Sequence, residues 1–147
     1  MSDDLVKLYS GRILELAADI PHLGHLPAPQ GSARRRSPLC GSTVSAEVVM
    51  KDGRVAEFAQ DVKACALGQA AAAVVGASAI GRSRAEVEAA RDALKAMLKE
   101  GAPPPTAPFD GFEVLIPARD YKNRHASILL SIEALAEAMA AAETAAA

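Results

Sequence analysis

The strongest constraint on the fold is an alternating hydrophobic pattern on either side of an Asp52-Gly53 pair. Apolar residues alternate with mostly polar ones over 43–50, and a second strand-like run follows at 55–62. This period of two is typical of half-buried strands, and Asp-Gly between two such runs indicates a tight β-hairpin. We therefore expect an antiparallel sheet, to which the segment 32–39 adds a further short strand.

Four helices are expected around this hairpin. The second of them carries no charge and is rich in alanine, which predicts close packing on several sides, and the third opens with the capping box Ser83-Arg84-Ala85-Glu86. The expected ranges are 3–19, 66–79, 83–100 and about 120–142, with a frayed tail at 143–147. The order indicates an α+β fold: a three-stranded antiparallel sheet covered on one face by helices, with an N-terminal helix and a long C-terminal helix. The length predicts a single domain, 1–147.

Composition excludes several functions. The formal net charge is −2 and aromatic residues make up 3% of the chain, so neither a basic surface nor a stacking platform for nucleic acid is expected. The uncharged stretch 64–81 is mostly Ala, Gly, Ser and Gln, which favours a buried helix over a membrane span. The acidic, polar start of the chain lacks the pattern of a signal segment, so we expect a cytoplasmic protein.

Three side chains are candidates for chemistry. Cys40 precedes Gly41 in a predicted turn, Cys65 lies at the predicted N-terminus of the alanine-rich helix, and His125 lies near the start of the last helix. Helix N-termini stabilise a thiolate, and the charge of Lys63 adds to this effect, so a lowered pKa is expected for Cys65. Each residue also has a purely structural interpretation: a packed core cysteine, or a capping histidine.

The other sequence motifs provide weaker evidence about function. No glycine-rich phosphate loop, HExxH motif or convincing Ser/His/Asp set is present, so an enzyme is not expected. The run Arg34-Arg35-Arg36 is either a solvated strand edge or a docking patch for an acidic partner.

Three segments together resemble the NifU/IscU-type iron–sulfur cluster scaffold family. Pro38-Leu39-Cys40-Gly41-Ser42 is similar to the family's Pro-x-Cys-Gly-Asp motif, and Lys63-Ala64-Cys65-Ala66 is similar to its second cysteine block. Arg124-His125-Ala126-Ser127 is similar to the third block, in which a cysteine normally stands at position 126. The helical insertion at 83–112 makes the chain more similar to the SufU branch than to the IscU branch.

The resemblance implies a scaffold that holds a transient [2Fe–2S] cluster, or an iron or zinc ion, at Cys40, Cys65 and His125. It also implies two kinds of partner: a cysteine desulfurase that delivers sulfur, and client proteins that receive the cluster. The chain departs from the family at Ser42, where an aspartate is expected, and at Ala126. Clusters and closed zinc sites are normally held by four ligands. In this chain Cys40, Cys65 and His125 supply at most three.

The departures leave three hypotheses open. The chain is a SufU-like scaffold with a reduced ligand set, or it has lost cluster binding and serves as an accessory subunit of a larger protein complex. The third hypothesis is a zinc protein or persulfide acceptor that uses Cys65 as its nucleophile.

Overall fold

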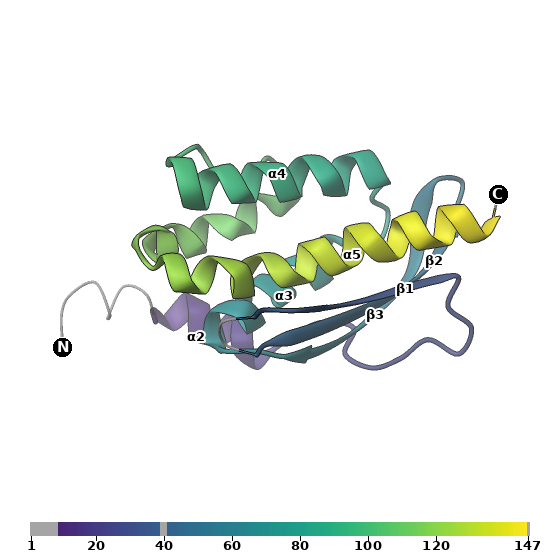
Figure 1. Ribbon diagram of the computed structural model, residues 1–147, viewed down its shortest axis with the longest axis horizontal. Helices are drawn as coiled ribbons and strands as arrows, with labels where there is room; N and C mark the ends of the chain where they lie inside the picture. The colour runs from purple at the N-terminus through teal and green to yellow at the C-terminus, as the bar shows by residue number, and fades with distance from the viewer. Residues whose placement is uncertain (1–8, 39–40, 147) are drawn as a thin grey trace.

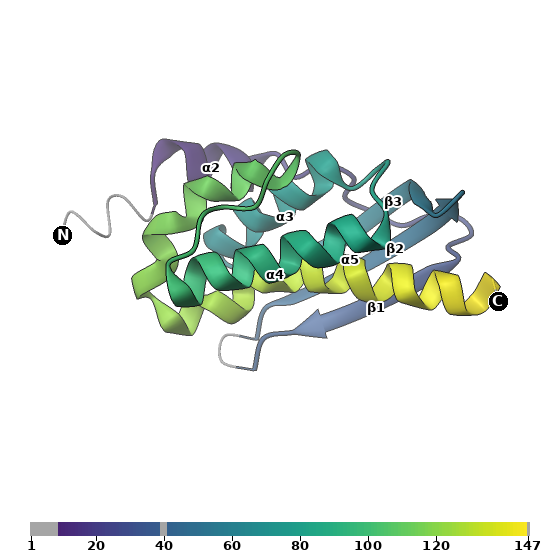
Figure 2. The same cartoon turned by 90° about the horizontal axis from the view of Figure 1, so that it is seen from above.

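The computed structural model describes residues 9–38 and 41–146. Its layers are visible in Figure 1: a sheet, then α3 (Ala66–Ser78) and α5 (His125–Ala146) on one face of that sheet, and α4 (Arg84–Glu100) outside them. The short helix α2 (Gly11–Ala18) lies against α3 at the end of the molecule nearest the N-terminus, as the view from above in Figure 2 also shows. The α+β architecture predicted from the sequence is confirmed.

The sheet consists of β1 (Gly31–Arg36), β2 (Thr43–Lys51) and β3 (Arg54–Lys63), antiparallel and in that order. Asp52 and Gly53 form the predicted turn with φ values of 53° and 76°, the left-handed pair that a two-residue hairpin needs. The alternation in β2 places Val44, Ala46 and Val48 in the core. The hairpin is therefore set by its own sequence, and β1 adds a strand at one edge.

The core lies between the sheet and the helices α3 and α5. Both helices are apolar on most of their circumference, because each has neighbours on several sides: α3 contacts α2, α5 and β3, and α5 contacts the sheet, α3 and α4. Gly31 in β1 allows α5 to approach the sheet closely, since a Cβ there would overlap the Ala138 carbonyl oxygen and lie 2.8 Å from the Ala142 Cβ. Small side chains thus determine how closely the layers pack.

The outer helix begins and ends as the sequence predicts. The Ser83 hydroxyl accepts a hydrogen bond from the Glu86 backbone N–H, and the Glu86 carboxylate accepts one from the Ser83 N–H, which is a complete capping box. Gly101 ends α4 in a left-handed conformation, with φ of 72°. Between α4 and α5 the chain forms the 3₁₀ helix η1 (Phe109–Asp120), which is followed by η2 (Lys122–Arg124).

The last helix differs from the expectation at both ends. It starts at His125, because η2 takes up the residues before it, and it remains helical to Ala146, past the predicted end at 142. Alanine has the highest helix propensity, and Glu143 forms an ion pair with Arg84 of α4, so the tail is held in place. The first predicted helix is described only from residue 9 onward, and there its helical part is α2.

By length and composition alone, the helical stretch 122–146 could cross a membrane. However, 72% of its most apolar window is buried inside the fold. The uncharged helix α3 has 13 residues, fewer than a span requires. Both helices therefore have the burial of core helices, which agrees with the expectation of no membrane span.

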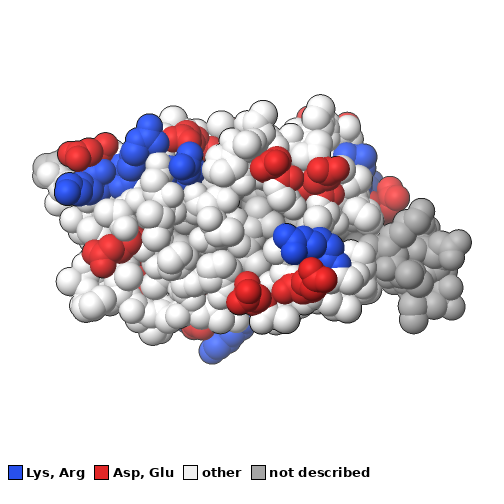
Figure 3. Space-filling model, turned by 180° about the vertical axis from the view of Figure 1, so that it is seen from behind, with Lys and Arg blue, Asp and Glu red and all other residues white. Residues whose placement is uncertain are grey.

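Charge is not concentrated on the face seen from behind in Figure 3. There, acidic and basic side chains form small mixed groups around a broad uncharged area.

Candidate functional site

The candidate site lies at the open end of the hairpin, where β2 begins and β3 ends. Thr43 pairs with Lys63 at this end, so Ser42 before β2 and Cys65 after β3 are brought close together. Cys65 is the N-cap residue of α3, and its backbone is extended, with φ of −68° and ψ of 171°. Cys65 is half-buried and packs against the core.

The hydroxyl of Ser127, in the first turn of α5, connects the two. Its Oγ lies 3.5 Å from the Cys65 Sγ and donates to the Ser42 Oγ at 3.3 Å. Ser127 is 1% exposed and Ser42 6%. A hydroxyl has one proton, so Ser127 can donate to Ser42 or to a Cys65 thiolate, but not to both at once. When the Cys65 thiol becomes a thiolate, rotation of the Ser127 O–H bond is therefore enough to move its hydrogen bond from Ser42 to the sulfur.

Gly68 allows the helices that carry this cluster to meet. A Cβ at Gly68 would lie 2.7 Å from the Ser127 Oγ and 2.8 Å from the Ala64 Cβ, distances that real side chains do not adopt. Gly68 is one turn into α3 from Cys65, and Ser127 is in the first turn of α5. The absence of a side chain at Gly68 is thus what brings Ser127 within contact of the sulfur.

His125 is buried at the N-terminus of α5, with 5% of its surface exposed. Its Nε2 lies 3.1 Å from the Ala118 carbonyl oxygen and 3.0 Å from the Arg119 carbonyl oxygen. Carbonyl oxygens only accept, so Nε2 carries the proton and donates to both. This bond fixes the end of η1 to the start of α5, and in the neutral ring it leaves Nδ1 as the nitrogen with a lone pair for a metal.

Ala126, where the family resemblance places a third cysteine, is half-buried and, together with His125 and Pro38, lines a pocket on the α4 side of α5. The residue that reaches the Cys65 sulfur is its neighbour Ser127. Successive residues of an α-helix point about 100° apart, so one position decides which side of α5 a side chain faces. Ser127 was not predicted from the sequence, because its only signal there was its place beside a motif position, together with the small residue at Gly68.

Cys40 lies outside the described residues. The described residues around it form a closed turn: the Gly41 N–H donates to the Ser37 carbonyl at 2.9 Å, and the Ser37 N–H donates to the Ser42 carbonyl at 2.8 Å. Gly41 has φ of 72°, which favours glycine at that position. Ser42 then leads directly into the contact with Ser127. Within 9–38 and 41–146, no group of three or more His, Cys, Asp or Glu side chains is arranged to hold a metal ion.

The structure thus joins Cys65 to Ser42 through Ser127, and it commits one nitrogen of His125 to two backbone carbonyls. The ligand set of Cys40, Cys65 and His125 stays a prediction.

Comparison with solved structures gives strong matches. The N-terminal part of a nitrogen-fixing NifU-like protein from Brucella abortus is 44% identical and has a TM-score of 0.94, with 97% of this chain and 99% of that chain covered. A protein assigned as an iron–sulfur cluster assembly scaffold of the SUF system, from the thermophile Fervidobacterium islandicum, shares the fold. Its TM-score is 0.80 at 18% identity, over 91% of this chain and 98% of that chain. No protein-family model and no curated protein matches the sequence.

Proposed function

Because the chain belongs to the NifU/IscU-type iron–sulfur cluster scaffold family, with SufU-like relatives, we propose that it is an assembly scaffold. In this role it receives sulfur from a cysteine desulfurase, holds a transient [2Fe–2S] cluster or a metal ion, and passes the cluster to client proteins in the cytoplasm. Scaffold proteins are not themselves enzymes, in agreement with the sequence-based expectation. The cluster is cargo here, so weak retention is compatible with the function.

One observation carries the proposal: the half-buried Cys65 lies at a helix N-terminus with its thiol in contact with the Ser127 hydroxyl. The free N–H groups of the first turn and the helix dipole favour negative charge at that position. Thiolate is the form of cysteine that binds metal or attacks a persulfide. In sulfur transfer, the Cys65 thiolate would attack the outer sulfur of the desulfurase persulfide; a new S–S bond forms on Cys65 and the desulfurase thiolate leaves.

The ligand set explains why any bound cluster would be labile. Cys65 and Cys40 supply two thiolates, and His125 has only Nδ1 available because Nε2 donates to Ala118 and Arg119. Ser42 and Ser127 are hydroxyls, which are poor ligands until ionised. A site with three protein ligands keeps one position for water or for a partner's side chain. Such a site would release its cargo more readily than four thiolates would.

The direct test is anaerobic reconstitution with ferrous iron, cysteine and a cysteine desulfurase. We expect the wild-type chain to gain iron and acid-labile sulfide together with the visible absorption of a cluster, and Cys65→Ser and Cys40→Ser each to lose most of it. The control is His25→Gln, which removes an exposed histidine paired with Glu47, away from the hairpin's open end. A wild-type chain that stays colourless, holds less than about 0.1 iron per chain and acquires no persulfide would exclude the scaffold role.

A second candidate function is an accessory subunit of a larger protein complex. It is favoured by the absence, within the described residues, of any metal-holding group of His, Cys, Asp and Glu side chains, and by Ser42 and Ala126 at two expected ligand positions. Affinity purification at native expression distinguishes the two. A stable, stoichiometric complex that survives the combined change of Cys40→Ala and Cys65→Ala favours the accessory role, and loss of the complex on that change favours the scaffold.

A further inference from the structure

A basic groove lies on the α4 side of α5, separate from the contact between Cys65 and Ser127. Its main pocket has a volume of about 690 Å³ and is bounded by α4, by the end of β1 with Ser37 and Pro38, by the end of η1 with η2, and by the first half of α5. Six basic and two acidic residues line this pocket, although the formal net charge of the whole chain is −2. The groove therefore has a local excess of positive charge in an acidic protein.

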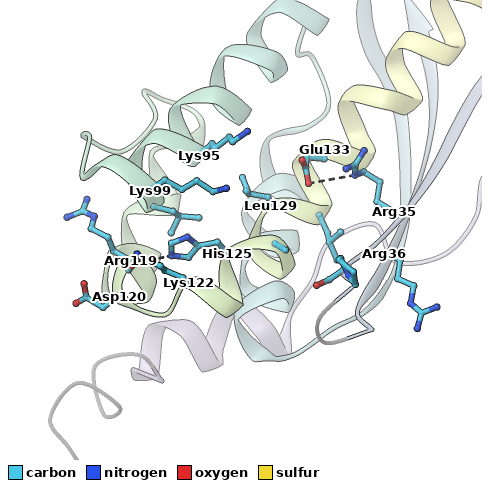
Figure 4. Close-up of a pocket in the computed structure, with 15 residues that line it drawn as sticks. Arg35, Arg36, Lys95, Lys99, Arg119, Asp120, Lys122, His125, Leu129 and Glu133 are labelled. Carbon is cyan, nitrogen blue, oxygen red and sulfur yellow. Dashed lines mark hydrogen bonds and ion pairs between the residues drawn. The ribbon is translucent and has the colours of Figure 1, made fainter.

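The charges that point into the groove come from two opposite walls. In Figure 4, Lys95 and Lys99 extend from α4 toward α5, and Arg35 extends from β1 toward Glu133, whereas Arg36 and Asp120 point away. The Arg35 guanidinium already has acidic partners, because it forms ion pairs with Glu133 and Glu137 of α5. Lys95 and Lys99 form neither an ion pair nor a side-chain hydrogen bond with any described residue. Two lysine amines thus face the groove without a protein counter-charge in contact.

The basic side chains follow a regular spacing along α4. Arg91, Lys95 and Lys99 are four residues apart, and Arg91 forms an ion pair with Asp92. A smaller pocket, which shares Lys95 with the main one, is lined by three basic and three acidic residues. Like charges at this spacing on one helix repel each other and weaken the helix. A bound anion between the helices would reverse this repulsion, so the spacing is unfavourable in the free protein and favourable in a complex.

Glu133 is the acidic side chain that Figure 4 shows within the groove, and its charge interacts with that of Lys95 without an ion pair between them. Burial raises the pKa of Glu133, although the nearby Arg35 acts against that rise. Its carboxylate is already engaged by the Arg35 guanidinium at 3.7 Å. Glu133 therefore offsets part of the charge of Lys95, whereas Lys99 has no acidic partner among the described residues, so the remaining positive charge must be balanced by solvent ions or by a ligand.

The groove also has an apolar part. Leu98, Leu129 and Leu130 line it, together with Pro38 and the small side chain of Ala126. The leucines are nearly fully buried, so each presents only a small apolar surface, and these surfaces together form the floor of the pocket. Volumes of this size, with apolar walls and a few charged groups, are typical of small-molecule sites. The position that holds a cysteine in the related motif is here a methyl group on the wall of the groove.

We propose that this groove binds a small organic phosphate, with its phosphate between Lys95 and Lys99 and its apolar body on the leucine floor. Charge-assisted hydrogen bonds to phosphate suit lysine as a point charge, and the floor favours a monoester with an organic group over the free ion. This site lies beside the predicted cluster site, since His125 and Ala126 line its wall, but Cys65 is not among the residues that line it.

The test uses AMP as the probe, with adenosine as the uncharged body and inorganic phosphate as the charge alone. In ¹H–¹⁵N NMR titrations of the full chain we expect AMP to shift the backbone signals of residues 95, 99, 126 and 129 in a saturable way. Its affinity should exceed those of adenosine and of phosphate by roughly tenfold or more and fall as salt is added, because the amines contribute charge and the floor contributes apolar contact.

Two double variants complete the test. Lys95→Met with Lys99→Met should weaken AMP binding by about tenfold or more, while Lys51→Met with Lys63→Met, which removes the same charge from exposed positions of the hairpin, should leave it unchanged. Cys40→Ser with Cys65→Ser should also bind AMP normally, which separates this site from the scaffold role. The proposal is overturned if AMP does not saturate, if adenosine or phosphate binds as well, or if the Lys95/Lys99 variant keeps wild-type affinity.

Discussion

The two ends of the β2–β3 hairpin are built from different kinds of polar contact. At the turn end, Glu86 accepts hydrogen bonds of 2.7 Å from Arg54 and from Arg82 and closes the capping box of α4. At the open end, Cys65, Ser127 and Ser42 are joined by neutral contacts of 3.5 and 3.3 Å. Charge-assisted bonds are about twice as strong as neutral ones. The turn end therefore contributes stability, and the open end keeps a sulfur available for chemistry.

This contrast predicts that substitutions at the turn end affect mainly stability, whereas substitutions at the open end also affect function. The pKa of Glu86 is lowered to about 2, first by the Ser83 backbone N–H and then by Arg54, so this carboxylate stays ionised in the folded protein well below its ordinary range. The cysteine end has no comparable network of ion pairs among the described residues. Four predictions make this comparison quantitative.

The largest expected effect comes from Gly68→Ala at the open end. The added methyl group would overlap the Ser127 hydroxyl and the Ala64 Cβ, so α3 and α5 must separate, and overpacking of this kind costs roughly 2–3 kcal/mol. Chemical unfolding measures the loss. The matched control is Gly111→Ala, where the new Cβ would make ordinary contacts of 3.4 and 3.5 Å with Val74. Equal stability for the two variants would show that the close approach at Gly68 does not hold the site together.

The second prediction concerns the turn end. Glu86→Gln should lower the free energy of unfolding by about 1–2 kcal/mol at pH 7, a range reduced for solvent screening because the side chain is 36% exposed. The folded pKa lies below the unfolded value of 4.5, so this stability is present above pH 4.5 and is lost as the pH falls toward about 2. The unfolding free energies of variant and wild type should converge over that interval, and a constant difference down to pH 2 would contradict the assignment.

The third prediction restores the expected ligands. Ser42→Asp combined with Ala126→Cys should tighten zinc binding by about tenfold or more, or roughly 1.4 kcal/mol, because a carboxylate and a thiolate replace a hydroxyl and a methyl group. Competition with a chromophoric chelator measures the affinity. Ser127→Cys, one position away on α5 but facing the Cys65 sulfur, is the informative comparison. If only Ser127→Cys tightens binding, position 127 has taken over the role of the third ligand.

The smallest effect is expected for Ser127→Ala. Removing a neutral hydrogen bond should lower the free energy of unfolding by about 0.5–1.5 kcal/mol. The rate of Cys65 alkylation should also change, because the variant has no hydroxyl that can donate a hydrogen bond to the Cys65 thiolate. The control is Ser131→Ala, which removes a buried serine hydroxyl one turn further along α5. Identical alkylation rates in wild type and both variants would separate Ser127 from the chemistry of Cys65.

Local patterns were sufficient to predict most of the fold. The Asp52-Gly53 turn, the alternating strand before it and the Ser83–Glu86 capping box each involve residues close in sequence, and each is present as predicted. The 3₁₀ helices η1 and η2 were not foreseen, because Pro117 and the apolar run around it have no regular period. The start of α5 depends on the bond from His125 to the carbonyls of Ala118 and Arg119, a tertiary contact with no sequence signature.

The candidate site was predictable only in part. Cys65 was identified from its place before a helix, and that place is confirmed. Ser127 was missed because its contact with sulfur depends on the closeness of α3 and α5, which Gly68 permits. The basic groove was missed because Lys95 and Lys99 come from α4 and Arg35 comes from β1, residues some sixty positions apart that only the packing of α4 on α5 brings together.

The most direct test of the central claim is metal and sulfide analysis of the native protein purified without oxygen, beside its Cys40→Ser/Cys65→Ser double variant. The scaffold account predicts iron with acid-labile sulfide, or zinc, in the wild-type chain at a substantial fraction of one site, and near-complete loss in the variant. Equal metal in both proteins, or none in either under conditions that load a SufU scaffold, would contradict it.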